Sequence, residues 1–218
     1  MFQKLISFTL LLALIQPLFS QTNVKEPFPY SNRFSLLGGL IQPLLLKGGN
    51  VEVNYFSKRI SFDYSHGFLL QVPASKTYAD QGICSFLPFS TGFGIGYRFL
   101  PFLDLRVEPK LHSWEVYYAN ENRRDVTPIA SYKTFTIGLG LYYRYMPFKN
   151  SKSMFLQGLT TSTSVRWWPN IGSTLSNDEF SYVNKFSQQT ETLKAANVGM
   201  ANTPFIFNIG VGFTFGGR

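Results

Sequence analysis

The stretch FIFNIGVGFTF, Phe205–Phe215, alternates between large apolar side chains and smaller ones along its whole length. Every second residue, starting with Phe205, is a phenylalanine, an isoleucine or a valine, while most residues between them are Asn, Gly or Thr. Because side chains alternate between the two faces of a strand, this period of two predicts a β-strand with one apolar and one small or polar face. Residues 135–145 and 103–111 repeat the pattern, so we expect several strands of this kind.

The chemistry of the second face indicates what surrounds these strands. In a soluble β-sandwich that face meets bulk water and is rich in Lys and Glu. Here it is mostly Gly, Thr, Ser and Asn with some charged residues, which suits the crowded interior of a narrow barrel. A transmembrane β-barrel presents apolar side chains to lipid and polar ones to its lumen. A strand of eleven residues rises roughly 33 Å, or about 25 Å once tilted, which matches the apolar band of such barrels.

Eight segments carry strand patterning, so the predicted fold is all-β, an eight-stranded antiparallel transmembrane β-barrel. The segments are residues 33–46, 51–57, 59–71, 91–100, 103–118, 131–145, 154–168 and 204–216. Their connections alternate between short (57–59, 100–102, 146–153) and longer, polar ones (72–90, 119–130, 169–203), with a tight turn at 47–50. Short periplasmic turns and longer outer loops are the asymmetry of outer-membrane barrels, and closure removes free sheet edges.

Two prolines fall inside these segments. Pro43 and Pro109 cannot donate a ladder hydrogen bond, and a closed barrel has no edge strand to accept them. Bulges commonly solve this problem, so we expect a local ladder break at both residues.

The N-terminus reads as an export signal. Residues 1–20 hold one lysine, an apolar run and then Pro17 and Ser20, the layout of a cleaved secretory signal peptide. The alternative, a membrane anchor, needs about 20 apolar residues, more than this run supplies. We therefore divide the chain into a signal peptide (1–20), an N-terminal periplasmic segment (21–32) and the barrel (33–218), with its long outer loop at 169–203.

Composition excludes several classes of protein. The 218 residues are 15% charged and 17% aromatic, which excludes a disordered chain. The single cysteine, Cys84, excludes a disulfide scaffold and a Cys-rich zinc site, and we expect a free thiol in a loop. The formal net charge is +8, but the Lys and Arg residues are scattered. We therefore expect no nucleic-acid partner, and assign the surplus to acidic lipid headgroups and the lumen.

The leader, the eight alternating segments and the terminal aromatic strand FIFNIGVGFTF together resemble the small eight-stranded outer-membrane β-barrel proteins of Gram-negative bacteria, the OmpX/OmpA-like group. The resemblance covers nearly all of the mature chain as architecture, without a diagnostic motif. It implies an outer-membrane location and contact with the barrel-insertion machinery. Such proteins often end on the terminal aromatic, whereas Gly216, Gly217 and Arg218 follow Phe215 here. The fold serves adhesins, passive barrels and lipid enzymes alike, so it does not define an activity.

Nine charged side chains fall on the lumen face of the predicted strands. They are Glu52, Asp63, Arg98, Asp104, Arg106, Glu108, Lys110, Arg144 and Arg166. Eight strands enclose an interior just wide enough for side chains to fill, and buried charges must nearly balance. We interpret the set as a lumen charge network that plugs the barrel, the alternative being a proton or ion pathway. With Tyr142 and Phe56 beside it, the network should leave no continuous water channel.

The remaining motifs predict no catalytic, cofactor or metal site. Each histidine adjoins a serine, in Ser65–His66 and His112–Ser113, but neighbours in a strand point to opposite faces and cannot pair as nucleophile and base. A pairing between distant segments stays open. The glycines of residues 92–96 lack the spacing and the following helix of a nucleotide loop, and read as lumen-facing strand positions.

The last long loop, 169–203, is the segment where we look for function, because long connections in compact domains are usually functional or disordered. Phe180, Tyr182 and Phe186 are predicted to pack over the outer mouth or to form a contact surface. Residues 190–196 are predicted to form a short helix with Ser187 as N-cap. The alternative is a disordered surface loop. The aromatic pairs at 117–118 and 167–168 are expected in the interface girdles, or less favourably in a carbohydrate platform.

Three functions are compatible with the sequence. We favour a non-enzymatic outer-membrane barrel with a structural or surface-interaction role, in contact with outer-membrane lipids and possessing an extracellular or surface partner for its loops. The second is an outer-membrane lipid-modifying enzyme, which needs a polar catalytic cluster near the rim. The third is a soluble periplasmic ligand-binding barrel, which needs its apolar face inside and charged residues outside.

Overall fold

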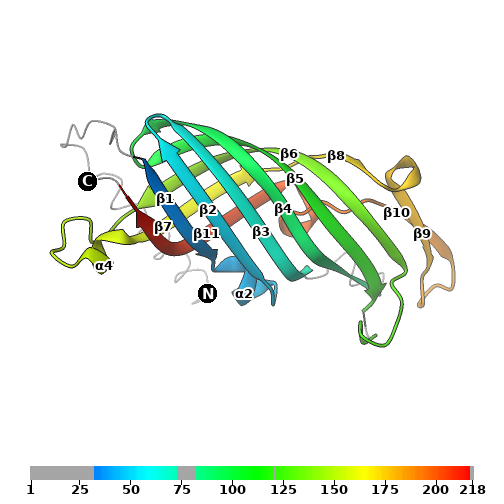
Figure 1. The fold of residues 1–218 in the computed structure, drawn as a ribbon. Coiled ribbons are helices and arrows are strands. Elements are labelled where there is room, and N and C mark those ends of the chain that lie inside the picture. The colour runs from blue at the N-terminus through cyan, green and yellow to red at the C-terminus, as the bar shows by residue number, and fades with distance from the viewer. Residues whose placement is uncertain (1–31, 73–81, 120, 217–218) are drawn as a thin grey trace, which may run out of the picture.

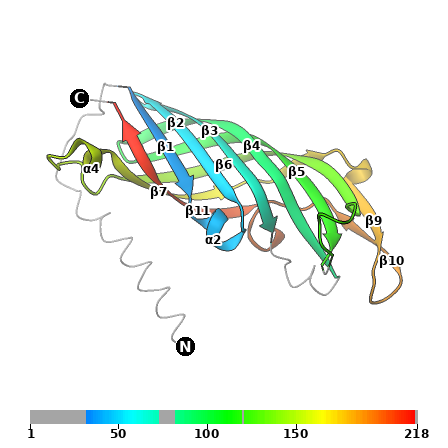
Figure 2. The same ribbon diagram turned by 60° about the horizontal axis from the view of Figure 1, so that its bottom comes forward.

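The computed structural model describes residues 32–72, 82–119 and 121–216. The predicted signal peptide and nearly all of the predicted periplasmic segment lie outside these residues. The described chain forms one tilted barrel of strands (Figure 1). A turned view of the same ribbon shows that the wall continues around the far side (Figure 2). No helix in the described ranges is long and apolar enough to cross a membrane.

Eight strands of the described chain close the barrel. They are β1 (Arg33–Gly39), β2 (Gly49–Ser57), β3 (Ile60–Val72), β4 (Ile83–Leu100), β5 (Leu103–Tyr118), β6 (Ala130–Tyr145), β7 (Leu159–Trp167) and β11 (Phe205–Phe215). Every neighbouring pair is antiparallel, β1 pairs with both β2 and β11, and β5 pairs with β6, so the ring has no open edge. The predicted eight-stranded antiparallel transmembrane β-barrel is confirmed.

The alternation of burial confirms which face points where. Along β6 every second residue is buried and every other is exposed or half-buried, and the exposed ones include Ile137, Leu139 and Leu141. Exposed apolar side chains also line β3, β4, β5 and β7. A largely apolar exterior around a charged interior is the arrangement of a membrane barrel. A soluble barrel with its apolar face inside is therefore wrong for this chain.

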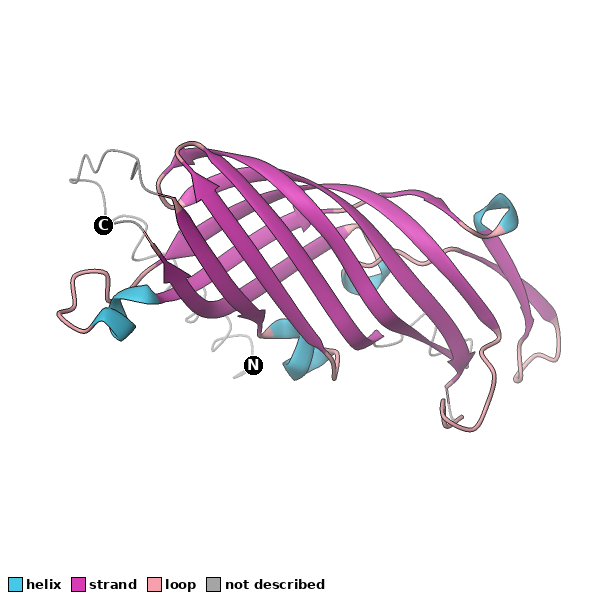
Figure 3. Ribbon diagram, in the orientation of Figure 1, coloured by secondary structure: helices cyan, strands magenta, loops and turns pink. Residues whose placement is uncertain are grey.

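The two ends of the barrel differ. At one end, which we call the turn end, the described connections are 58–59, 101–102 and 146–158. At the other, the loop end, they are 40–48, 168–204 and the connection after β5, of which 119 and 121–129 are described, together with the connection from β3 to β4, of which residue 82 is described. The first residue of β1 and the last of β11 both lie at the turn end. Short helical pieces occur at both ends (Figure 3).

The first strand is shorter than predicted. Instead of running to residue 46, β1 ends at Gly39 and a helical turn, α2 (Ile41–Leu45), follows. The amide of Leu40 still donates to Ile209, after which Leu44 and Leu46 donate to helical acceptors at positions 40 and 42. Pro43 lies in the first turn of this helix, where its missing N–H costs little. The expected strand break at Pro43 is therefore wrong, because the residue is not in a strand.

Pro109 does break its ladder, as predicted. The pairing of β4 with β5 stops after Gly92 opposite Lys110 and resumes at Ile95 opposite Val107, in an unchanged register. On its other side β5 pairs without interruption, with Pro109 opposite Ile137. The missing proline N–H is therefore accommodated by a gap in one ladder, without an added residue.

Two other boundaries differ from prediction. Strand β4 begins at Ile83 and not at residue 91, so Cys84 lies in a strand, although its thiol is free as expected. The segment 154–158, predicted as strand, is the helical turn α4 (Met154–Gly158). Met154 and Phe155 are largely exposed there. The start of β4 was missed because a register shift between Phe86 and Ser90 breaks the alternation, whereas residues 154–158 were read as strand although they form a helical turn.

The polarity of the wall inverts near the loop end. On β5 and β6 the outward pair Leu111 and Phe135 is apolar, but the next outward pair is Ser113 and Lys133. From the same level the inward residues change from charged to apolar, beginning with Trp114. An apolar exterior thus ends between residues 111 and 113, and the strands continue beyond it with a polar exterior.

This extension is completed by the last long connection, 168–204. It contains β8 (Asn170–Ser173), which pairs with β6, a hairpin of β9 (Glu179–Val183) and β10 (Thr190–Lys194), and two short 3-10 turns, η1 (Ser176–Asp178) and η2 (Met200–Asn202). The predicted helix over 190–196 is wrong, because residues 190–194 pair with β9 and alternate exposed and half-buried positions. We call residues 83–89, 113–118, 130–134 and 170–198 the cap.

Candidate functional site

All nine predicted lumen residues point into the barrel, and none is more than 9% exposed. They come from six strands: Glu52 on β2, Asp63 on β3, Arg98 on β4, Asp104, Arg106, Glu108 and Lys110 on β5, Arg144 on β6 and Arg166 on β7. Alternation on each strand places them on the inner face, and closure brings them together.

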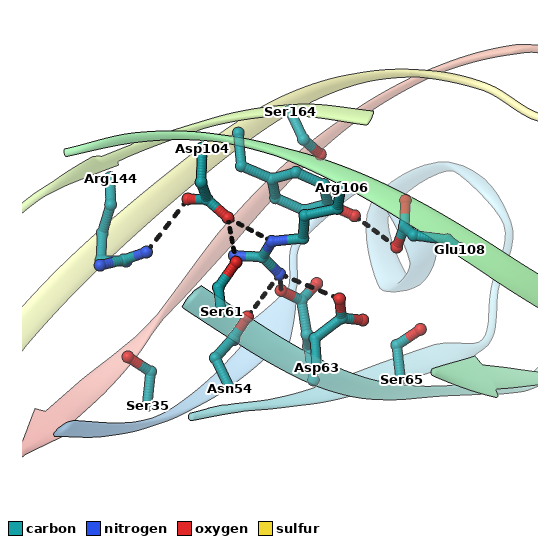
Figure 4. A network of polar contacts seen from close by, with 12 residues as sticks. Ser35, Asn54, Ser61, Asp63, Ser65, Asp104, Arg106, Glu108, Arg144 and Ser164 are labelled. Atoms are coloured by element: carbon teal, nitrogen blue, oxygen red, sulfur yellow. Dashed lines mark hydrogen bonds and ion pairs between the residues drawn. The ribbon is translucent and has the colours of Figure 1, made fainter. Parts of the chain in front are cut away.

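Arg106 is the centre of the network (Figure 4). Its Nε donates to Asp104 Oδ2, and Nη1 lies 3.3 Å from both Glu52 Oε1 and Asp63 Oδ1. Asn54 accepts another hydrogen bond from the same Nη1. One guanidinium thus neutralises carboxylates from three strands. The planar group also lies over the Tyr142 ring, 3.8 Å from its centroid, an arrangement to which arginine is well suited.

Glycines on both neighbouring strands make room for this long side chain. Arg106 pairs with Gly96 on β4 and with Gly140 on β6. A Cβ added at Gly96 would lie 2.7 Å from Arg106 Cγ, and one at Gly140 would lie 2.7 Å from the Tyr142 ring. The glycines on the lumen face of the neighbouring strands therefore leave the space that the charged side chains of β5 occupy.

A second group surrounds Glu108 toward the loop end of the lumen. Its Oε1 accepts a 2.6 Å hydrogen bond from Tyr142 and lies 3.4 Å from Lys110 Nζ. Trp168 Nε1 donates to its other oxygen at 3.2 Å. The Lys110 ammonium lies 4.3 Å from the Trp168 ring centroid and donates to Ser65. This carboxylate is thus held by two neutral donors and one cation.

Arg166 joins the second group to the first. Its Nη2 lies 3.1 Å from Glu52 Oε2 and its Nε donates to Ser164. Its guanidinium carbon is 4.7 Å from the Tyr142 ring centroid. The lumen charges form one connected network as a result.

Arginines also close the turn end. Arg98 donates from Nη1 and Nη2 to the carbonyls of Lys58 and Pro101, at 2.8 and 2.9 Å, which ties two short turns together. Arg144 lies 3.3 Å from Asp104 and stacks over the Phe56 ring at 3.5 Å. Phe56 is 1% exposed and fills the space below the network.

Paired charges and aromatic rings together occupy the lumen. Each of the four carboxylates contacts a cationic side chain, and the aromatic rings of Phe56 and Tyr142 lie between the arginines. Burying these ions is tolerable only when partners offset their lost hydration. Along the described strands the lumen is filled by side chains, as an interior of eight strands permits.

The structure contains one serine–histidine pair from distant segments, a pairing that the sequence left open without naming its residues. Ser90 Oγ lies 2.8 Å from His112 Nδ1, and His112 Nε2 lies 2.9 Å from Thr136 Oγ1. The imidazole is fully buried and joins β4, β5 and β6 at the level where the polarity of the wall inverts. The positions opposite each other in the register, Ser90 with His112 and His112 with Thr134, were hidden until the pairing was known. In the described ranges no group of three or more potential metal ligands is arranged to bind an ion.

The aromatic pair at 167–168 divides between the two environments. Trp167 is 46% exposed on the outer wall, as expected for an interface residue. The same prediction is wrong for Trp168, because this residue is buried in the lumen and its indole lies over Gly138. A Cβ built at Gly138 would fall 1.5 Å from the ring, so only glycine leaves space for it.

The cap has its own apolar core. Its fully enclosed members come from four strands and the last connection: Leu70, Ile83, Leu87, Trp114, Val116, Tyr132, Tyr182 and Ala196. The Trp114 indole stacks on the Tyr132 ring and donates to Thr134 at 2.9 Å. The Tyr132 hydroxyl in turn accepts from the amide of Ala196 at 3.0 Å. The cap is therefore a packed unit.

The predicted contact residues of the last connection have different surroundings. Tyr182 is 4% exposed and belongs to the core of the cap, so its assignment to a contact surface is wrong. Phe180 is half-buried and stacks on Tyr132. Phe186 is 72% exposed. Burial and the hydrogen bond to Glu191 raise the pKa of Tyr182 well above its ordinary value. Apolar residues in a long loop indicated burial, but the sequence could not distinguish packing from a binding face.

The hairpin is fixed to β5 at its tip. Tyr118 on β5 donates to the carbonyl of Val183 at 2.9 Å, and Lys185 lies over the Tyr118 ring. Lys185 also pairs with Glu121 at 2.6 Å. The connection from β7 to β11 is therefore held at the loop end by β5 and by the connection that follows it.

These features define a transmembrane β-barrel with a filled, charged lumen. A scan against protein-family models and a search of curated proteins gave no match. Among solved structures, the N-terminal β-barrel domain of Pseudomonas aeruginosa OprF is 14% identical, with a TM-score of 0.40 over 85% of this chain and 98% of that chain. A major outer membrane protein from Thermus thermophilus is 12% identical, with a TM-score of 0.44 over 85% and 99%. Ail, the attachment invasion locus protein of Yersinia pestis, is 10% identical, with a TM-score of 0.37 over 85% and 95%. The fold assignment itself rests on the strand pairing and burial of this chain.

Proposed function

We propose that the protein is an integral outer-membrane barrel that acts without transport through its lumen, and that its cap is a structural and surface-interaction element outside the cell. The observation that carries the proposal is the contrast between a lumen filled by paired charges and a separately packed cap beyond the apolar band. A pore needs an open lumen, whereas a surface protein needs a rigid platform above the lipid.

The orientation follows from the connections. The turn end has two-residue connections at 58–59 and 101–102, and the loop end carries the long connection 168–204. Outer-membrane barrels have short periplasmic turns and longer extracellular loops. The cap therefore lies on the extracellular side, and Phe186 and Lys185 at the hairpin tip are the residues that a partner meets first.

An epitope insertion tests this orientation. A tag placed after Ser187, at the exposed hairpin tip, should bind antibody on intact cells. The matched control is the same tag after Lys149, in the turn-end connection, which should bind antibody only after the outer membrane is opened. Labelling of the Lys149 tag on intact cells would contradict the orientation, and recovery of the protein in the soluble fraction would contradict the membrane location.

Planar-bilayer recording tests the plug. Purified protein should show no steady large conductance, because Arg106, Tyr142 and Phe56 fill the lumen. The comparison variant is Tyr142→Ala with Trp168→Ala, which removes two large buried rings from the lumen and should produce measurable current. Steady conductance from the unaltered protein would overturn the proposed function.

A further inference from the structure

A groove of about 380 Å³ lies on the outer wall of β3, β4 and β5, beyond the apolar band. Its floor includes Phe86 and Tyr117, which face outward and yet are only 8% and 5% exposed. Residues of the connection after β5 line the same groove, and one of them, Arg123, lies over the Phe86 ring. Elsewhere in the cap, outward positions such as Ser113 and Lys133 are polar, so an aromatic floor at this place is an exception.

Cations surround this floor. Lys47 comes from the connection after β1, and Arg123 and Arg124 come from the connection after β5. The Arg123 guanidinium lies 3.3 Å from the Phe86 ring centroid. The carboxylate that lines the groove, Glu121, is already paired with Lys185. Among the described residues, none of the three cations forms an ion pair. The groove is therefore positively charged.

The backbone holds these cations in place. The Leu46 carbonyl accepts a 2.7 Å hydrogen bond from the amide of Gln71, and Gly48 lies against the backbone of Phe68 and Leu69. On the other side, Asn122 bonds to Asp125 through side chain and backbone and forms the turn that carries the arginines. Both connections are thus ordered by contacts that do not use the cationic groups.

The groove is continuous with the lipid-facing wall. Phe68 and Leu69 are 40% and 54% exposed beside it, and Leu111 is the last exposed apolar residue of β5. A ligand that fits these surroundings has an anionic group, which the cations of the groove bind, and a hydrocarbon part, which contacts the apolar wall. Arginine pairs and lysine suit phosphate oxygens, and cationic residues at a membrane surface attract anionic headgroups.

We propose that this groove binds the phosphorylated headgroup of a lipid in the leaflet next to the cap. Arg123 and Arg124 hold the phosphate from the side of β5, and Lys47 holds it from the side of β1. The acyl chains follow the wall past Phe68 and Leu69. A free phosphate would use the same cations but would leave that apolar path unused. The inference depends on the membrane position proposed above, although it does not require a surface partner.

The protein carries its own reporter for the test. Cys84, the chain's only cysteine, lines the groove and is half-buried with a free thiol. The full barrel is inserted into phosphatidylcholine vesicles with or without diphosphoryl lipid A, and alkylation of Cys84 by a maleimide is timed. We expect alkylation to slow severalfold when the phosphorylated lipid is present, and inorganic phosphate alone to have no effect.

Charge-reversal variants assign the protection to the groove. Arg123→Glu with Arg124→Glu should weaken lipid A binding roughly tenfold or more and restore fast alkylation. The matched control, Lys58→Glu with Lys152→Glu, makes the same charge change at exposed positions of the turn end and should keep the protection. Lys47→Glu is a single, independent variant with the same expectation as the arginine pair. Heat-modified gel mobility confirms that each variant is folded.

Three results would overturn the inference. The first is equal alkylation with and without lipid A in the unaltered protein. The second is protection that survives in the arginine variant or disappears equally in the control pair. The third is full protection by inorganic phosphate, which would show a phosphate site that does not select a lipid. The epitope experiment reads the orientation separately, so a failure here leaves the proposed function standing.

Discussion

The lumen and the cap use opposite chemistry within the same strands. On β5 the inward residues Arg106 and Glu108 are charged and paired, whereas Trp114 and Val116, a few residues farther along, are apolar. The outward residues change in the reverse direction at the same level. The interior therefore changes from charged to apolar at the level where the exterior changes from apolar to polar.

The difference teaches what holds each region together. The hydrophobic effect needs water that can be released, and lipid chains are as apolar as leucine side chains. Inside the apolar band, moving a leucine from the wall to the lumen would gain little, so hydrogen bonds and ion pairs provide the cohesion. The exterior of the cap is polar, as at Ser113 and Lys133. There an apolar core around Trp114 is the effective way to stabilise the wall.

The largest expected effect comes from removing the central cation. Arg106→Leu should lower the free energy of unfolding by about 3–5 kcal/mol, because Glu52, Asp63 and Asp104 lose a shared buried partner. Urea unfolding in lipid vesicles, followed by tryptophan fluorescence, measures the loss. Lys152→Leu also replaces a cation with leucine, but at an exposed position of the turn end, and should have a midpoint near that of the unaltered protein. Equal midpoints for the two variants would contradict the network.

A cap substitution should have a more local effect. Trp114→Ala should cost the cap about 3 kcal/mol, since a fully buried indole is replaced by a cavity. Hydrogen exchange should quicken at residues 114–118 and 130–134 while the strands within the apolar band stay protected. Trp167→Ala, on the lipid-facing wall, is the control. If the whole barrel exchanged faster, the cap and lumen would be one cooperative unit and the comparison would fail.

A glycine substitution probes the boundary between the regions. Gly138→Ala should destabilise the barrel by about 1–3 kcal/mol, because the added methyl group displaces the Trp168 indole from Glu108. Gly172→Ala, in the strand that pairs with the same β6, meets no atom within 4 Å and should be nearly neutral. Matched heat-modification gels compare them. A neutral Gly138→Ala variant would show that Trp168 can move at little cost.

The smallest effect concerns a single hydroxyl group of the cap. Tyr182→Phe removes a 2.7 Å hydrogen bond to Glu191 and should cost about 1 kcal/mol. The raised pKa of Tyr182 means that the folded cap binds this proton more tightly than the unfolded chain does. Its contribution is complete below the ordinary tyrosine pKa of about 10 and is lost as the pH rises above it. Protease resistance of the cap, measured from pH 9 to pH 11, should fall less steeply in the variant.

The alternation in the sequence was enough for the barrel and its inner face. Strand β5 was predicted with its observed bounds, and β11 within one residue at each end. Side-chain period is a local property, so it survives without any knowledge of partners. The charged residues of the lumen were found by the same rule, and the structure adds their contacts.

The cap was beyond that rule for physical reasons. Residues 83–89 read as loop because register shifts between Phe86 and Ser90 break the alternation. Residues 190–196 suited a helix by propensity, but pairing with β9 decided their conformation. The change from apolar to polar outward residues at 111–113 is visible in the sequence. It would have been enough to predict where the membrane-spanning part of the strands ends and the cap begins.

The barrel closes where its first strand, β1, pairs with its last strand, β11, so it cannot form before the whole chain is present. Ser35 and Thr214 share a 2.7 Å hydrogen bond across 179 residues of sequence. Until the last strand has been synthesised and delivered, β1 and β7 each carry an unsatisfied edge that invites pairing with another chain. The ring can therefore close only after the last strand has arrived, and a chain that loses Phe205–Phe215 leaves β1 and β7 each without a partner on one side.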